Sequence, residues 1–305
     1  MPLDLPKVSI LISAYNKEQT VLQAIESALA QSYPNKEIVV CEDQSQDKTW
    51  VLLQKYQNRA GIKIYQNQKN LGRVGNHHHL LYDLAQGGYV IMLDADDYFL
   101  DANYISLAVE MALLNSLDFV FSQSLVQRPN GSTFKAEFPL LISGVYSWRD
   151  VFKNGILFMH GAVLYRRDPA LNYNFYSQNI IADDNESFLR FIVGRKLGFL
   201  KQSAYLYRQD NNPDRSTLDD RLSNDSMIEH VYNFAIKADS SERELFKDWQ
   251  IKMRANFFYG NLLNLLVHQK FGDAVRYLVA YYKKNGWPRF FQALIRPLVV
   301  SRLVH

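Results

Sequence analysis

The N-terminal third of the chain alternates short apolar runs with longer segments whose apolar positions recur at helical spacing. Apolar, largely β-branched runs predict buried strands at 8–13, 36–41, 62–65 and 89–93. Helical spacing predicts helices over 21–29, 49–58 and 75–85. Strands that alternate with helices imply an α/β fold, with a mostly parallel central sheet, right-handed crossovers and helices on both faces.

The pattern becomes less regular after Asp118. Apolar runs at 119–122 and 161–165 predict further strands, and residues 129–132 predict a turn. From Ser226 onward the chain is helix-compatible and rich in large apolar residues, apart from a break at 286–288. We therefore expect an α/β domain over residues 1–222 and a helical C-terminal region over 223–305.

Polar clusters follow three of the predicted strands, at Asn16, Asp43 and Asp96. The carboxyl ends of parallel strands share one edge of a sheet, so these loops should open onto a single crevice. Three carboxylates at the end of a buried strand (Asp94, Asp96 and Asp97) would be penalised by desolvation unless a cation or another partner compensated them. Mg²⁺ or Mn²⁺ suits such oxygen ligands. The alternative is that the acids cap the next helix.

The acidic loop over residues 42–47 has two interpretations. Its carboxylates could accept hydrogen bonds from a nucleobase N–H or from ribose hydroxyls. Alternatively, Ser45 and Asp47 cap the helix that begins near Thr49. The two interpretations can hold for different residues of the loop.

Composition and charge narrow the classes of protein. The 305 residues include 34 Lys and Arg against 31 Asp and Glu, for a net charge of +3, and 48% are hydrophobic, which excludes overall disorder. Residues 274–305 hold six basic residues and no acid, so the rest of the chain is mildly acidic. This distribution argues against a nucleic-acid groove over the whole protein. The single cysteine, Cys41, excludes an internal disulfide framework and fits a reducing compartment.

No uncharged apolar run reaches the ~18 residues of a membrane span. The first seven residues carry Asp4 and two prolines in place of a basic signal-peptide start. A cytoplasmic location is expected.

The order and spacing of the motifs resemble family 2 glycosyltransferases of the GT-A fold. The similarity rests on residues 9–16, 31–34, 37–40, 42–49, 70–72 and 93–97. It is close over about residues 7–100 and weaker to about 216. The resemblance implies an inverting transfer of a sugar from a nucleotide diphosphate sugar, with UDP as the family's default, to a hydroxyl of a saccharide, lipid-linked or polymeric acceptor, assisted by Mn²⁺ or Mg²⁺.

The resemblance also implies roles for individual residues. Those expected to bind the sugar nucleotide are Ala14, Tyr15, Asn16, Glu18, Asp43, Ser45, Asn70, Arg73, Asp94 and Arg208. Asp94 and Asp96 would form the D-x-D pair that holds the metal, with Asp96 touching it directly. Asp184, with Asp183 beside it, would be the catalytic base that takes the acceptor's proton. Taken without the resemblance, these two acids predict the N-terminus of a helix.

The sequence departs from the family pattern at several positions. Ser13 replaces a proline, and Glu42 and Gln44 replace the Asp and Gly of the family's D-D-G-S. Gly75 stands where an arginine is frequent, which leaves Arg73 to contact phosphate. Asp210 stands where a histidine is usual, and its carboxylate could still ligate a hard cation. These departures keep open a second hypothesis, a catalytically weakened module that binds nucleotide sugars or acts as a scaffold.

Other features receive structural interpretations. Successive helical residues point about 100° apart, so His77, His78 and His79 cannot all converge on one ion. Cys41 is expected to be buried packing. By family analogy His160 lines the acceptor side, and a core histidine is the alternative.

The basic, aromatic-rich C-terminal end has three interpretations that the sequence leaves open. Apolar positions at helical spacing between Val275 and Val299 are flanked by arginines. Such a helix suits an anionic membrane surface, packing on the catalytic domain, or contact with a second subunit in a homo-oligomer.

Overall fold

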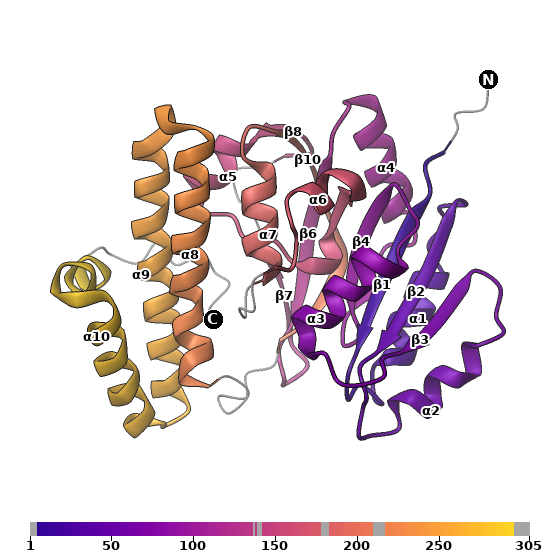
Figure 1. Ribbon diagram of the computed structural model, residues 1–305, viewed down its shortest axis with the longest axis horizontal. Coiled ribbons are helices and arrows are strands. Elements are labelled where there is room, and N and C mark those ends of the chain that lie inside the picture. Colours follow the sequence, from indigo (N-terminus) through magenta and orange to yellow (C-terminus); the bar gives the residue numbers. More distant parts are fainter. Residues whose placement is uncertain (1–4, 137, 139–141, 178–182, 210–216, 296–305) are drawn as a thin grey trace. The chain divides into compact units, whose positions relative to one another are not determined.

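The computed structural model describes residues 5–136, 138, 142–177, 183–209 and 217–295 (Figure 1). The chain forms two compact units. The first comprises residues 1–147, 158–179 and 195–209, and the second comprises residues 148–157, 180–194 and 210–305. Residue 222, where the sequence predicts a domain boundary, lies inside a helix of the second unit. The division of the chain into domains at this residue stays a prediction.

A single sheet forms the centre of the first unit. Its strand order is β3-β2-β1-β4-β9-β6-β10-β5. The predicted strands β1 (Val8–Ala14), β2 (Lys36–Glu42), β3 (Ile62–Gln66) and β4 (Tyr89–Asp94) are mutually parallel. Next to them, β9 (Val163–Arg166) runs antiparallel to both β4 and β6 (Phe119–Gln127). The predicted alternation is therefore confirmed for the N-terminal part of the chain.

Four further strands complete the sheet. The long β10 (Lys196–Arg208) runs parallel to β6, and it pairs antiparallel with β8 (Gly144–Ser147) and with β5 (Tyr98–Phe99) at its two ends. The short β7 (Thr133–Ala136) forms a hairpin with β6 across the predicted turn at 129–132. The sequence pattern did not predict these four strands, because β10 lacks strict alternation and the others are short.

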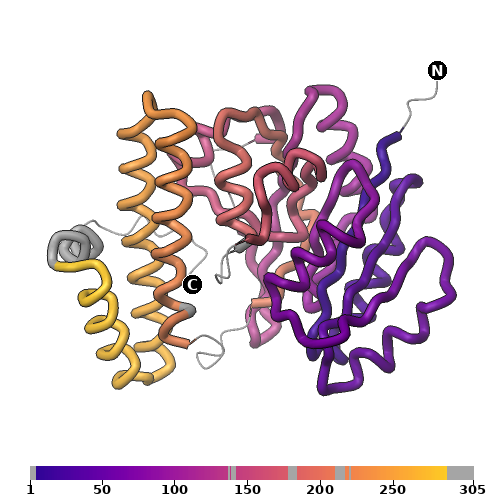
Figure 2. The backbone as a smooth tube through the Cα atoms, in the orientation of Figure 1, coloured from indigo at the N-terminus to yellow at the C-terminus, as the bar shows by residue number. Residues whose placement is uncertain are grey.

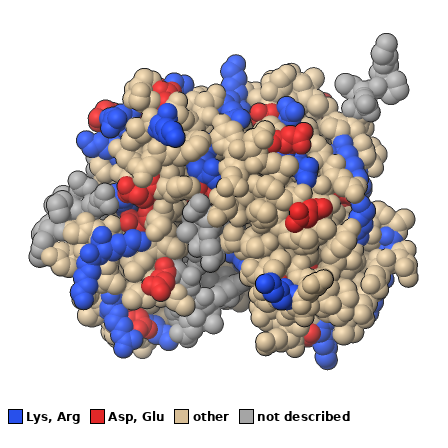
Figure 3. All heavy atoms as spheres, viewed as in Figure 1, with Lys and Arg blue, Asp and Glu red and all other residues tan. Residues whose placement is uncertain are grey.

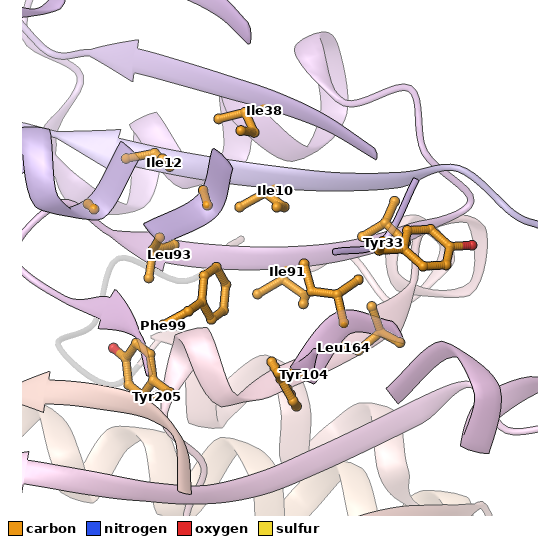
Figure 4. Close-up of a cluster of buried hydrophobic side chains, with 14 of the residues drawn as sticks. Ile10, Ile12, Tyr33, Ile38, Ile91, Leu93, Phe99, Tyr104, Leu164 and Tyr205 are labelled. Carbon is orange, nitrogen blue, oxygen red and sulfur yellow. The ribbon is translucent and has the colours of Figure 1, made fainter. Parts of the chain in front are cut away.

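The helices of the first unit cover both faces of the sheet. On one face lie α1 (Val21–Leu29), α2 (Thr49–Leu53) with the turn η1 (Gln54–Tyr56), and α4 (Tyr104–Leu114). Their apolar side chains pack with Ile10, Ile12, Ile38, Ile91 and Leu93 in one buried core (Figure 4).

The opposite face carries α3 (Gly72–His79) and a π-helical turn, η2 (Leu80–Leu84). Because side chains alternate along a strand, Ser13, Cys41 and Asp94 point to this face. Asn76 of α3 donates to the Ser13 hydroxyl at 2.9 Å and to the Cys41 carbonyl at 3.0 Å. Cys41 is fully buried, as expected, and burial raises the pKa of its thiol to about 12. The short elements η3 (His160–Ala162) and α6 (Arg167–Asn172) flank β9.

The second unit is helical. It contains α5 (Trp148–Asn154), α7 (Asp183–Ile192), α8 (Leu218–Ala238), the turn η5 (Ser240–Glu242), α9 (Arg243–Val267) and α10 (Phe271–Ile295). Helices α8 and α9 lie side by side, and α10 follows α9 (Figure 2). The predicted break in the last helix occurs at Gly286, whose φ is 72°. Among the described residues, no helix is both long enough and apolar enough to cross a bilayer.

Candidate active site

Two loops at the carboxyl edge of the sheet are tied to each other by side chain-to-backbone hydrogen bonds. The Asn16 N–H donates to the Ser45 hydroxyl at 2.9 Å, and the Gln46 N–H donates to the Asn16 side chain at 2.8 Å. The Lys48 N–H donates to the Glu18 carboxylate at 3.0 Å. Asn16, Glu18 and Ser45, predicted to bind the donor, are thus brought together. Asn16 therefore bonds across to the other loop, and α1 begins without a side-chain cap.

Glu42 and Asp43 organise the second loop from inside. The buried Glu42 carboxylate accepts the Gln44 N–H at 3.2 Å and also accepts the Ser45 N–H. Gln44 has a φ of 59°, the left-handed conformation that glycine adopts most easily, and it stands where the family pattern has glycine. The sequence departure at Gln44 therefore leaves the loop geometry in place at some conformational cost.

Asp43 links this loop to the start of α3. Its Oδ1 accepts the Asn67 side-chain N–H at 2.7 Å and the Leu71 N–H at 2.8 Å. Asn70 donates to the Asp43 carbonyl at 2.8 Å. Asp43 is only 2% exposed, and its carboxylate is engaged by the neighbouring loop. Its contact with a nucleobase stays a prediction. Tyr15 is exposed beside this loop, Ala14 is buried, and Arg73 is exposed in the first turn of α3.

The three carboxylates at the end of β4 and just after it, Asp94, Asp96 and Asp97, have three different environments. Asp96 forms an ion pair with Lys17, which is not among the residues predicted from the sequence motifs. The Asp96 side chain is 21% exposed. Arg208 of β10 donates to the Asp96 carbonyl, and its guanidinium lies 5.0 Å from the centre of the Tyr98 ring. Two cationic side chains therefore lie beside Asp96.

Asp97 points inward. It accepts hydrogen bonds from the Tyr205 hydroxyl and, at 2.8 Å, from the Arg208 N–H. Desolvation, together with the neighbouring charges of Asp96 and Asp94, raises the pKa of Asp97 well above the ordinary value. Asp97 therefore joins β10 to the end of β4 and does not cap the next helix.

Asp94 lies between two buried imidazoles. Its Oδ1 is 3.4 Å from His77 Nε2, and its Oδ2 is 3.5 Å from His160 Nδ1. Desolvation alone would raise the pKa of Asp94, but the interactions with His160 and His77 outweigh it and hold the pKa well below the ordinary value. Each carboxylate of the cluster thus has a compensating partner within the chain. His160 is both a buried histidine and a neighbour of the D-x-D motif.

The predicted base lies in the second unit. Asp183 and Asp184 open α7, as the helix N-terminus interpretation expected, and Asp184 is half-buried. One turn further, the fully buried Glu186 accepts a hydrogen bond from Arg190 at 3.0 Å and contacts His230 of α8. This network fixes α7 within the helical unit. Asp210, the predicted substitute for the family histidine, lies outside the described residues.

Several known proteins are similar to this chain. The chain matches the family model described as "Glycosyl transferase family 2" over residues 9–173, more than half of its length. WfaP of Escherichia coli, a UDP-Glc:alpha-D-GlcNAc-diphosphoundecaprenol beta-1,3-glucosyltransferase, is 34% identical over 140 residues, which are 46% of this chain and 51% of WfaP. The cholesterol galactosyltransferase of Borreliella burgdorferi is 30% identical over 217 residues, 65% of this chain and 59% of that protein. The chain thus spans little more than half the length of these relatives.

Solved structures share the fold at low sequence identity. Residues 1–349 of TarS from S. aureus, in complex with UDP, match with a TM-score of 0.59 at 17% identity and cover 92% of each chain. The mannosyltransferase PcManGT from Pyrobaculum calidifontis, in complex with GDP-Man and Mn²⁺, matches with a TM-score of 0.58 at 16% identity, over 94% of this chain and 78% of that one. The predicted GT-A fold with a helical C-terminal region is confirmed. The motifs, the sheet and the family match lead to one conclusion: the protein belongs to glycosyl transferase family 2.

Proposed function

We propose that this protein is an inverting glycosyltransferase that moves a sugar from a UDP-linked donor to a hydroxyl of a saccharide, lipid-linked or polymeric acceptor. The observation that carries the proposal is the position of Asp96 beside Lys17 and Arg208 at the carboxyl edge of the sheet. Acidic and cationic groups gathered at this edge suit a metal-bound diphosphate. The relative WfaP is named for a UDP-glucose donor and a diphosphoundecaprenol-linked acceptor, which favours polysaccharide biosynthesis.

The nucleoside would lie against the paired loops. Tyr15, Asn16, Asp43 and Ser45 are the nearest candidates for base and ribose contacts, and Glu18 and Asn70 brace the same loops. Arg73 and Arg208 would contact phosphate. Arginine suits this role because its fork of N–H donors matches phosphate oxygens.

A hard divalent cation, Mn²⁺ or Mg²⁺, fits Asp96. Such ions take oxygen ligands and complete their coordination with water and substrate phosphates, so one partly exposed carboxylate is a sufficient protein anchor. Asp96 would hold the ion, with Asp210 as the proposed second ligand. When bound, the ion supplies positive charge for the departing diphosphate. Lys17 and Arg208 add charge of the same sign.

Asp184 is the proposed base, with Asp183 beside it. Inversion requires a carboxylate that accepts the acceptor's proton while the diphosphate leaves from the opposite face of the sugar. The start of α7 favours the ionised form of a carboxylate, because the helix N-terminus carries partial positive charge. The buried Glu186 carboxylate contacts His230 of α8 and so holds that helix in place.

The test is sugar transfer by Asp96→Ala and Asp184→Ala variants. Each is expected to lower the release of UDP from a UDP-sugar in the presence of Mn²⁺ and acceptor by about 100-fold or more, with the fold intact by circular dichroism. Asp83→Ala, at a carboxylate whose side chain is 61% exposed, is the matched control and should keep wild-type activity. Full activity in either variant would remove that residue from the mechanism.

A binding module without turnover is the competing function. It predicts that UDP-sugars raise the melting temperature of the protein, while no acceptor leads to release of UDP. A thermal-shift series with UDP, GDP, TDP and CDP sugars, each with and without Mn²⁺, would also identify the base of the donor. Stabilisation by GDP-sugars alone would contradict the assignment of UDP.

We assign the enzyme to the cytoplasm, at the inner face of the membrane. The supporting feature is an apolar ridge on the second unit, formed by exposed side chains at the end of α9 and along α10: Leu263, Leu266, Val267, Phe271, Val275 and Val279. Lys270, Arg276 and Lys283 lie along the same segment, together with one acid, Asp273, which pairs with Arg276. An exposed apolar ridge with neighbouring cations is typical of a surface that binds anionic lipid.

A further inference from the structure

We infer that His77, Asp94 and His160 form a binding site for a divalent transition-metal ion, separate from the hard-cation position at Asp96. The three side chains come from α3, the end of β4 and η3. Their ligand atoms all lie within 4.8 Å of one another. The inference does not depend on the proposed function, because it concerns metal binding by the chain in the absence of any donor.

The distances favour ligands of a metal over hydrogen bonds. A carboxylate and an imidazole that share a proton approach to about 2.7–2.9 Å. Here the N···O separations are 3.4 Å to His77 and 3.5 Å to His160. Two ligands of a tetrahedral Zn²⁺, each about 2.0–2.1 Å from the metal, lie about 3.3 Å apart. The two separations that involve Asp94 therefore match the spacing of ligands that share an ion, and a small movement of the carboxylate and imidazoles would complete the site.

The surroundings orient the two imidazoles. His160 Nε2 lies 2.8 Å from the Tyr176 hydroxyl, which leaves Nδ1 directed at Asp94. Metal-binding histidines usually engage their second nitrogen in this way. The rings of His77 and His160 meet edge to face with centroids 4.8 Å apart, and His77 also contacts Tyr176. The two histidine side chains are 1% and 5% exposed, so packing holds them in place.

The donor set also selects the class of ion. Two imidazole nitrogens and one carboxylate oxygen suit Zn²⁺, Co²⁺ or another transition metal better than Mg²⁺, which prefers an all-oxygen shell. The Asp94 side chain is 32% exposed, which gives the ion an approach from solvent and an open coordination position. A bound ion would fasten Asp94, the first aspartate of the D-x-D motif at the end of β4, to α3 and η3.

The experiment measures Zn²⁺ binding by the full chain after removal of metals with a chelator, in the absence of nucleotide. Wild type is expected to bind Zn²⁺ at this site, and His77→Ala and His160→Ala should each weaken the affinity by at least about 10- to 100-fold. His78→Ala is the matched control, because the His78 ring stacks on Tyr82 outside the cluster. His78→Ala and Asp96→Asn should both keep the wild-type affinity.

A second measurement, the melting temperature with and without Zn²⁺, separates loss of metal binding from misfolding of a variant. Asp94→Asn keeps the size of the side chain while removing its charge. Zn²⁺ should raise the melting temperature of wild type and of His78→Ala but not that of Asp94→Asn. Equal Zn²⁺ affinity in wild type, His77→Ala and His160→Ala would overturn the inference, as would loss of Zn²⁺ binding only in Asp96→Asn. Neither result would bear on sugar transfer, which is assayed separately with Mn²⁺.

Discussion

The acids that follow β4 carry less negative charge than their number suggests. The pKa of Asp94 is held well below the ordinary value and that of Asp97 is raised well above it, so the two neighbours titrate apart. Asp97, with the Tyr205 hydroxyl as donor, serves as a buried structural link. Asp96, paired with Lys17, is the carboxylate that we propose as the ligand of a hard cation.

A different carboxylate, Glu37, shows how a buried acid can stabilise this fold. Glu37 is 4% exposed at the start of β2. It accepts hydrogen bonds from the Ser9 hydroxyl at 2.6 Å and the Gln86 N–H at 2.8 Å, and lies 2.9 Å from the Lys7 ammonium. Desolvation raises the pKa of Glu37, but these contacts together with Lys63 lower it below the ordinary value of 4.5.

Glu37→Gln should therefore destabilise the protein by about 1–3 kcal/mol at neutral pH. Because the pKa is lower in the folded state, the stabilisation is present above the unfolded pKa and is lost as the pH falls through the folded pKa. Urea unfolding of both proteins should show a difference that narrows below pH 4.5. Glu26→Gln, at a side chain that is 53% exposed, is the control and should cost about 1 kcal/mol or less. A difference that grows on acidification would contradict this account.

At the scale of elements, the join between η2 and β4 depends on a close approach of two backbones. A Cβ on Gly87 would lie 2.6 Å from the Ser9 nitrogen and 2.8 Å from the Lys7 carbonyl oxygen. The Gly87 N–H donates to the Ser9 hydroxyl at 2.8 Å. The neighbouring Gly88 has open space around the same position.

Gly87→Ala is therefore expected to destabilise the protein by about 1–3 kcal/mol, because the rigid backbone of β1 cannot move away cheaply. Gly88→Ala is the matched control, with an expected change within about 0.5 kcal/mol. Denaturant midpoints of the two variants measure the contrast. Equal midpoints would mean that β1 and β4 adjust to the added methyl group.

Local sequence patterns predicted the elements that carry their own periodicity. The four parallel strands and α1 were predicted close to their observed bounds, since each has a continuous apolar run or a helical stripe. By contrast, β10 mixes apolar and polar residues and shifts register against β6 between Leu200 and Tyr205, so no single period describes it.

The candidate site, like the fold, was predictable only where the local sequence carries a recognisable pattern. The polar loops were predicted because they follow recognisable strands. His77, His160 and Lys17 reach Asp94 and Asp96 only through the fold, since they come from other elements. His77, His78 and His79 contact Asp94, Tyr82 and Asp83 respectively, so they do not converge on one point. His77 instead meets a histidine from another element, His160.

At the scale of the whole molecule, basic and acidic side chains are interspersed over the face shown in Figure 3. The small net charge of +3 therefore gives little long-range attraction to polyanions. Affinity for a membrane would have to come from local features, and the apolar ridge of α9 and α10 is the candidate. Phe271 is 62% exposed and Val275 59% exposed, one helical turn apart.

The full chain should therefore co-sediment with phosphatidylcholine vesicles that contain phosphatidylglycerol, and less with phosphatidylcholine alone. A Phe271→Asp, Val275→Asp double variant should bind about 10-fold more weakly or worse, since burying such side chains is worth about 1.5–3 kcal/mol each. Leu114→Asp is the control, because Leu114 is 76% exposed on α4 in the other unit. Unchanged vesicle binding, or a wild-type dimer that the double variant abolishes, would rule out the membrane assignment.

The hydrogen bonds between the loop after β1 and the loop after β2 have a practical consequence for protein engineering. Residues 16–18 and 45–49 supply donors and acceptors to one another in both directions. If one loop is lengthened, shortened or exchanged alone, polar groups of the other loop lose their hydrogen-bond partners. Attempts to change the preference for the nucleotide sugar should therefore replace both loops together.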